Sequence, residues 1–95
     1  MSAVIDQAVT ELNAKLDGGF DGSAKFVIED EGSIVMDPQG ARAGDDATDV
    51  TMTADADTFK KILDGALDPT TAFMTGRLKV DGDMGQAMKL ASALG

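Results

Sequence analysis

One stretch of the chain, residues 68–94, reads DPTTAFMTGRLKVDGDMGQAMKLASAL and contains start signals for a short helix, a strand and a second helix. Asp68 followed by Pro69 is the arrangement expected where a capping carboxylate precedes a proline in the first turn of a helix. Leu78 and Val80 then alternate with polar residues, which is typical of a half-buried strand. The stretch therefore predicts a helix–strand–helix unit.

The last helix of this unit has a broad apolar face. Asp83 with Gln86 three residues later is a variant of the capping box, which predicts that the helix begins there. The apolar residues that follow fall on one side of a helix with about 3.6 residues per turn, and they are Met84, Ala87, Met88, Leu90, Ala91 and Leu94. This face is uncharged and rich in flexible side chains.

The methionines allow two interpretations. Met36, Met52, Met74, Met84 and Met88 all occupy positions on the apolar faces of predicted elements. Methionine commonly fills irregular gaps in a protein core, and the residues alone favour this interpretation. The alternative is a flexible wall around an apolar ligand of variable shape.

Hydrophobic periodicity and turn signals predict the rest of the chain. In order, we expect a helix over residues 2–16, strands over 24–30, 33–37 and 49–53, and a helix over 55–64. Ser2 and Asp55 are the expected caps of the two helices. These elements predict an α+β domain, with a mainly antiparallel sheet and helices gathered on one face. The connection before the last strand can place that strand parallel to a neighbour.

Length and composition predict a single domain over residues 1–95. The chain is 43% hydrophobic with a mean hydropathy of -0.05. No apolar run approaches the ~20 residues that a membrane span needs, so stable membrane insertion is not expected. The N-terminal sequence MSAVIDQAV lacks the basic region and long apolar stretch of a signal peptide. The expected location is therefore the cytoplasm.

The absence of cysteine and histidine excludes several kinds of site. There can be no disulfide framework, thiol nucleophile, imidazole base or Cys/His zinc site. The serines lack a G-x-S-x-G context, and no EF-hand loop is present. We therefore expect no enzyme activity, no cofactor and no metal. A hydrolase with paired carboxylates stays open on spacing alone.

The chain is strongly acidic, with a formal net charge of -9 and a pI near 4.1. Phosphate contacts need clustered lysine or arginine, so a nucleic-acid partner is not expected. Docking on anionic lipid is disfavoured for the same reason.

The family resemblance rests on the order D-P-x-x-A-F-x-x-G-x-L-x-V-x-G-D-M-x-x-A-M-x-L over residues 68–90. This order closely resembles the sterol carrier protein type 2 family, which consists of small lipid-binding and lipid-transfer domains. The resemblance extends more loosely over residues 51–65, and before Val50 it is one of element order only. It implies a short edge strand over 41–43 and thus a five-stranded sheet with the order α-β-β-β-β-α-α-β-α. It also implies an apolar tunnel between the sheet and the helices.

By resemblance, the protein is expected to bind, and to transfer, a fatty acid, acyl-CoA, phospholipid or sterol-like molecule without catalysis. The resemblance also favours the ligand-wall interpretation of the methionines. We expect a monomer or weak dimer, with Arg42 or Arg77 as candidates to meet an anionic head group. The residues expected to line the core and tunnel are Phe26, Ile28, Ile34, Met36, Val50, Met52, Phe59, Ile62, Phe73, Met74, Leu78, Val80, Met84, Met88, Ala91 and Leu94.

Two other functions stay open at this point. One is an accessory or scaffold protein that presents an isoprenoid or quinone intermediate to biosynthetic enzymes. The other is a stably folded domain whose core is full. Peroxisomal members of the family end in Ser/Ala-Lys-Leu, whereas this sequence ends Ala93-Leu94-Gly95, so a peroxisomal location is not expected.

Overall fold

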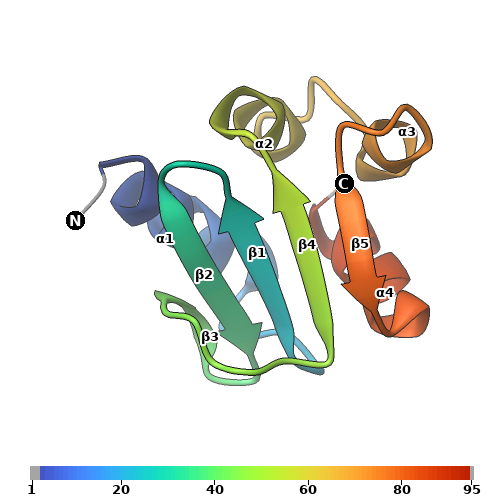
Figure 1. Ribbon diagram of the computed structural model, residues 1–95. Helices are drawn as coiled ribbons and strands as arrows, with labels where there is room; N and C mark the ends of the chain where they lie inside the picture. The colour runs from blue at the N-terminus through green and yellow to red at the C-terminus, as the bar shows by residue number, and fades with distance from the viewer. Residues whose placement is uncertain (1–2, 95) are drawn as a thin grey trace.

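The computed structural model describes residues 3–94, with four helices and five strands in that range. Figure 1 shows the sheet with α1 and α4 behind it and with α2 and α3 at one end of the strands. The predicted order of elements is confirmed, and the elements are α1 (Ala3–Leu16), β1 (Ala24–Ile28), β2 (Gly32–Asp37), β3 (Gly40–Ala43), β4 (Val50–Ala54), α2 (Ala56–Leu63), α3 (Pro69–Met74), β5 (Lys79–Gly82) and α4 (Met84–Leu94). The predicted cap Ser2 lies outside the described residues.

The sheet has the strand order β3-β2-β1-β4-β5. β1 pairs antiparallel with β2 and parallel with β4, and the β2–β3 and β4–β5 pairs are antiparallel. The sheet is therefore mixed, which corrects the expectation of a mainly antiparallel sheet. The last strand is also not the parallel one. Since α2 and α3 lie at the end of the sheet where β4 finishes, β5 starts from that same end and runs back antiparallel to β4 (Figure 1).

One face of the sheet forms the core. Side chains alternate across a strand, and the inward ones on β1 and β4 are fully buried while their neighbours are half-buried. The Phe26 ring packs against Phe59 of α2 with a centroid distance of 4.4 Å. The largest fully buried side chains are Leu12, Phe26, Ile28, Ile34, Met36, Val50, Met52, Phe59, Ile62, Leu90 and Leu94.

The predicted helix caps at Asp55 and Asp68 are confirmed. The Asp55 carboxylate accepts a hydrogen bond of 2.7 Å from the Thr58 backbone N–H, and this bond holds the pKa of Asp55 below its usual value. The Asp68 carboxylate accepts one of 2.9 Å from the Thr70 N–H, with Pro69 in the first turn. Both bonds satisfy N–H groups that have no partner inside the helix.

The capping box predicted at Asp83 and Gln86 is only half formed. Asp83 Oδ1 accepts hydrogen bonds from the backbone N–H groups of Gly85, 2.8 Å, and Gln86, 3.2 Å. The N–H of Asp83 itself donates to the Asp49 carbonyl at 2.9 Å, so it is not available to the Gln86 side chain. Within residues 3–94, Gln86 Oε1 is buried and has no hydrogen-bond partner.

The free side of β3 is protected by a side chain. Asn13 of α1 accepts a hydrogen bond from the Ala41 N–H at 2.8 Å and donates one to the Ala41 carbonyl at 3.0 Å. The amide thus takes the place of a neighbouring strand. An edge strand without such cover exposes a row of unpaired backbone groups.

We expect Asn13→Ala to lower the free energy of unfolding by about 1–3 kcal/mol, because it leaves the backbone groups of buried Ala41 without partners. Urea titration measures the change. Lys15→Ala on the exposed side of the same helix is the control, with an expected effect within about 0.5 kcal/mol. Equal losses in the two variants would contradict the role given to Asn13.

Candidate ligand-binding cleft

An apolar cleft of about 240 Å³ lies between α3, β5 and α4. Thr70 is the only polar residue among those that line it within the described chain. The lining residues are Met52, Pro69, Thr70, Phe73, Met74, Leu78, Val80, Met84, Ala87, Met88 and Ala91.

Local structure explains why these side chains meet. Val80 of β5 lies opposite Met52 of β4 in the antiparallel register, and both line the cleft. The Ala72 carbonyl near the end of α3 accepts hydrogen bonds from the N–H groups of Arg77, 2.9 Å, and Leu78, 3.0 Å. This turn directs Leu78 inward, where only 2% of it is exposed. The α4 residues that line the cleft are three or four positions apart, so they share one helix face.

Large apolar side chains surround the mouth of the cleft. Phe73 is 43% exposed, Met74 79%, Met84 47% and Met88 57%, and these are the large hydrophobic residues exposed within residues 3–94. All of them belong to α3 or α4 and line the cleft. A contiguous exposed apolar surface commonly marks a site for a ligand or a partner. The surface around the cleft is therefore apolar and exposed to solvent instead of being packed into the core.

The structure divides the residues expected to line the core and tunnel into two groups. One group lines the cleft: Met52, Phe73, Met74, Leu78, Val80, Met84, Met88 and Ala91. The other group lies in the packed core away from the cleft, with at most 1% exposure: Phe26, Ile28, Ile34, Met36, Val50, Phe59, Ile62 and Leu94. The methionines divide in the same way, since Met36 fills the core while Met74, Met84 and Met88 are exposed.

The cleft is open to solvent along α3 and α4, and within residues 3–94 the structure does not show a closed tunnel between sheet and helices. Its volume is somewhat below the ~300–1,000 Å³ of common small-molecule pockets. An apolar chain would therefore lie partly in the cleft and partly against the exposed side chains at its mouth.

Sequence reasoning missed three lining residues, Pro69, Thr70 and Ala87. Ala87 lies on the predicted apolar face of the last helix, so the helical period could have identified it. Pro69 and Thr70 carry only capping signals, which give no indication of a ligand site.

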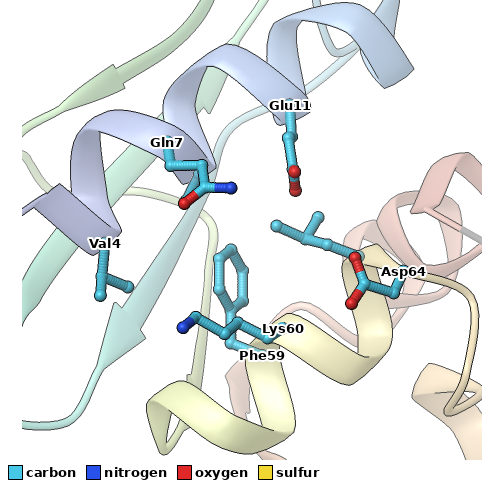
Figure 2. A pocket seen from close by; sticks show the side chains of 8 residues that line it. Val4, Gln7, Glu11, Phe59, Lys60 and Asp64 are labelled. Carbon is cyan, nitrogen blue, oxygen red and sulfur yellow. The ribbon is translucent and has the colours of Figure 1, made fainter.

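Two other hollows have a more polar lining. In Figure 2, Gln7 and Glu11 of α1 point toward α2, whose Phe59 ring lies between the helices. This pocket measures about 160 Å³ and is also bordered by Lys60 and Asp64. A third hollow beside β2 and β3 is larger, about 290 Å³, but is bordered by Asp6, Glu31 and Asp45 among others. The third hollow has a larger volume than the cleft, but the cleft has the mainly apolar lining that is typical of ligand sites. We therefore take the cleft as the candidate site.

Charged groups do not form a metal site in the described part of the chain, where no three acidic side chains gather as ligands. Arg42 is engaged on the far edge of the sheet, 2.9 Å from Asp37 and 3.7 Å from Asp46. Its hydrogen bond to Asp37 lowers the pKa of that carboxyl. Arg77 is also exposed, and it directly precedes Leu78, which lines the cleft.

A mixed sheet, helices at one face and one end, and an apolar cleft against the last helix define a small α+β domain with a candidate site for an apolar ligand. The chain belongs to the SCP-2 sterol transfer family, whose family model matches residues 5–95. The resemblance noted in the sequence is thereby confirmed. None of the helices in residues 3–94 has the length and hydropathy to cross a membrane.

Among curated proteins, the chain is 40% identical over 82 residues to hydroxysteroid dehydrogenase-like protein 2 of Xenopus tropicalis, covering 78% of this chain and 20% of that protein. It is 37% identical to the Xenopus laevis protein of the same name, covering 96% of this chain and 23% of that one. The chain thus spans about a fifth of the length of these relatives.

Among solved structures, the chain is similar to sterol carrier protein 2 of Aedes aegypti in complex with palmitate. The TM-score is 0.78 at 24% identity, covering 99% of this chain and 96% of that one. It is also similar to a UbiJ-SCP2 ubiquinone synthesis protein, with a TM-score of 0.66, 16% identity and coverage of 96% and 88%. At these sequence identities, the structural similarity shows a shared fold only.

Proposed function

We propose that the protein binds a long-chain lipid by placing its acyl chain in the cleft between α3, β5 and α4, and that it can transfer this lipid. The observation that carries the proposal is the coincidence of an apolar cleft with the exposed Phe73, Met74, Met84 and Met88 at its mouth. Each methylene that leaves water contributes about 0.8 kcal/mol, so an acyl chain gains affinity along its whole contact with these residues. The palmitate complex of the Aedes aegypti protein supports a fatty acid as the first ligand to test.

Polar groups near the cleft would orient the head group. Thr70 is exposed at the cleft, and Arg77 precedes Leu78 of its wall. The hydrogen bonds from Thr58 are the main cause of the lowered pKa of the Asp55 carboxyl, and the charge of Arg77 lowers it further. An exposed arginine next to a lining residue suits a ligand with a carboxylate head group. Fatty acids and other single-chain anionic lipids fit this arrangement.

The proposed role is binding without catalysis. The sequence has no histidine or cysteine, and Asp68 and Asp83, two acidic residues that flank lining residues of the cleft, already accept hydrogen bonds from helix N-termini. A group committed to capping is poorly placed to act as a general base.

A plugged cleft tests the proposal. Ala91→Phe fills the cleft from α4, whereas Ala93→Phe places the same ring on an exposed position of the same helix outside the cleft. We expect Ala91→Phe to weaken the affinity for palmitate by about tenfold or more, which corresponds to ~1.4 kcal/mol. Titration with a fluorescent fatty acid, followed by its displacement with palmitate, measures this affinity. Ala93→Phe should leave the affinity unchanged. Equal affinity in both variants and the parent chain would rule out this cleft as the lipid site.

A second candidate function is presentation of an isoprenoid or quinone intermediate to biosynthetic enzymes. The similarity to the UbiJ-SCP2 ubiquinone synthesis protein favours it. The two functions differ in what accompanies the bound lipid. Exchange of fatty acids with vesicles in the absence of any protein partner supports the carrier, and an isoprenoid that co-purifies together with biosynthetic enzymes supports presentation.

A further inference from the structure

The outer edge of β5 has no neighbour within the described chain. β5 is the last strand of the sheet, whereas the opposite edge strand, β3, is covered by Asn13. Figure 1 shows β5 at the margin of the sheet, with α3 beyond one end and α4 behind it. Open strand edges are sites where another strand can add to the sheet.

The register with β4 determines which backbone groups point outward. The Asp83 N–H donates to the Asp49 carbonyl, and this pair continues the register in which Asp81 lies opposite Thr51. Because hydrogen-bonding direction alternates along an antiparallel strand, Asp81 and Lys79 also direct their backbone groups toward β4. Val80 therefore directs its N–H and C=O to the open edge.

The side chains of the edge are complementary to a second copy of themselves. If two β5 strands pair antiparallel about Val80, the two Val80 residues exchange both backbone hydrogen bonds. Lys79 of each copy then lies directly opposite Asp81 of the other copy, on the outer face of the sheet. These are non-hydrogen-bonded pairs, in which side chains approach most closely and opposite charges stabilise the pairing.

The same charges disfavour the neighbouring registers. Pairing about Asp81 would oppose two aspartates, and pairing about Lys79 would oppose two lysines, and like charges directly opposite each other are destabilising. A shift by a single residue would place apolar side chains of one copy on the outer face of the other. Of these registers, the one centred on Val80 places no like charges of β5 directly opposite each other, and it also keeps the hydrogen bonding and the sidedness of the sheet.

We propose that β5 is a homodimerisation edge, through which two copies join their sheets antiparallel about Val80. Both exposed residues that form the ion pairs, Lys79 and Asp81, lie outside the cleft, so the interface goes beyond the proposed lipid site. The two-fold axis is perpendicular to the sheet and places both clefts on the same side of it.

The test uses charge reversal, measured as self-association of the lipid-free full chain by sedimentation velocity from about 10 µM to 1 mM. We expect the parent chain to dimerise reversibly, and Lys79→Asp and Asp81→Lys each to weaken dimerisation by about tenfold or more. The double variant Lys79→Asp/Asp81→Lys restores opposite charges and should recover the parent affinity. Lys60→Asp on α2 is the matched control.

The pattern of outcomes separates this edge from a general effect of charge. The two single reversals move the formal net charge of -9 in opposite directions, so net repulsion cannot explain a loss in both. A chain that stays monomeric at every concentration, single variants that dimerise like the parent, or a double variant that fails to recover would each overturn the proposal. Since the lipid is absent, none of these outcomes depends on the proposed function.

Discussion

Palmitate is expected to raise the melting temperature of the lipid-free protein by roughly 10–20 °C at a free concentration about 100 times its Kd. A ligand that binds only the folded state at that concentration adds about 2.7 kcal/mol to the free energy of unfolding. For a domain of fewer than about 100 residues, 1 kcal/mol shifts the melting temperature by about 4–8 °C. Differential scanning calorimetry of delipidated protein measures the shift.

The size of the shift should follow the apolar contact in the cleft. Fatty acids with shorter chains bury fewer methylene groups against Met84 and Met88, so they should give smaller shifts at equal concentration. Ala91→Phe should abolish most of the shift, and Ala93→Phe should retain it. An unchanged melting temperature of the parent chain at saturating palmitate would contradict lipid binding by the folded state.

The elements could be predicted because their signals are local. The caps at Asp55 and Asp68 each need one carboxylate and an N–H two or three residues away, and the sequence contains both partners. The capping box at Asp83 was predicted by the same logic, but only half of it forms. Its second half failed because the Asp83 N–H bonds to Asp49, a residue 34 positions earlier that no local pattern identifies.

The strand arrangement is less accessible to sequence reasoning for the same physical reason. The β1–β2 hairpin follows from a short turn, but the choice of β1 as the parallel neighbour of β4 depends on tertiary packing. Likewise, the alternation of Met36 and Met52 predicts that both point inward. Their positions relative to the cleft depend on tertiary structure. Met52 lies in β4, which pairs with β5 beside α3 and α4, whereas Met36 lies in β2.

Replacement of Phe26 by alanine is expected to have the largest effect on stability, a loss of about 3–5 kcal/mol in the free energy of unfolding. Phe26 is fully buried and packs against the Phe59 ring at 4.4 Å, so the substitution leaves a cavity and removes an aromatic pair. Because small domains have a total stability of about 5–15 kcal/mol, this variant can be largely unfolded. Phe26→Leu keeps most of the volume and should give a smaller, measurable loss by urea titration.

The contrasting variant is Met88→Ala at the mouth of the cleft. Met88 is 57% exposed, so its removal should change stability by no more than about 0.5 kcal/mol, because little buried surface is lost. If the cleft holds the acyl chain, the same substitution weakens palmitate binding, whereas Phe26→Leu leaves the affinity of the folded protein unchanged. The reverse pattern, with stability lost at Met88 and affinity lost at Phe26, would place the lipid among the side chains now assigned to the core. The division between core and cleft therefore rests on two separate measurements, stability and affinity, which these two residues should affect in opposite ways.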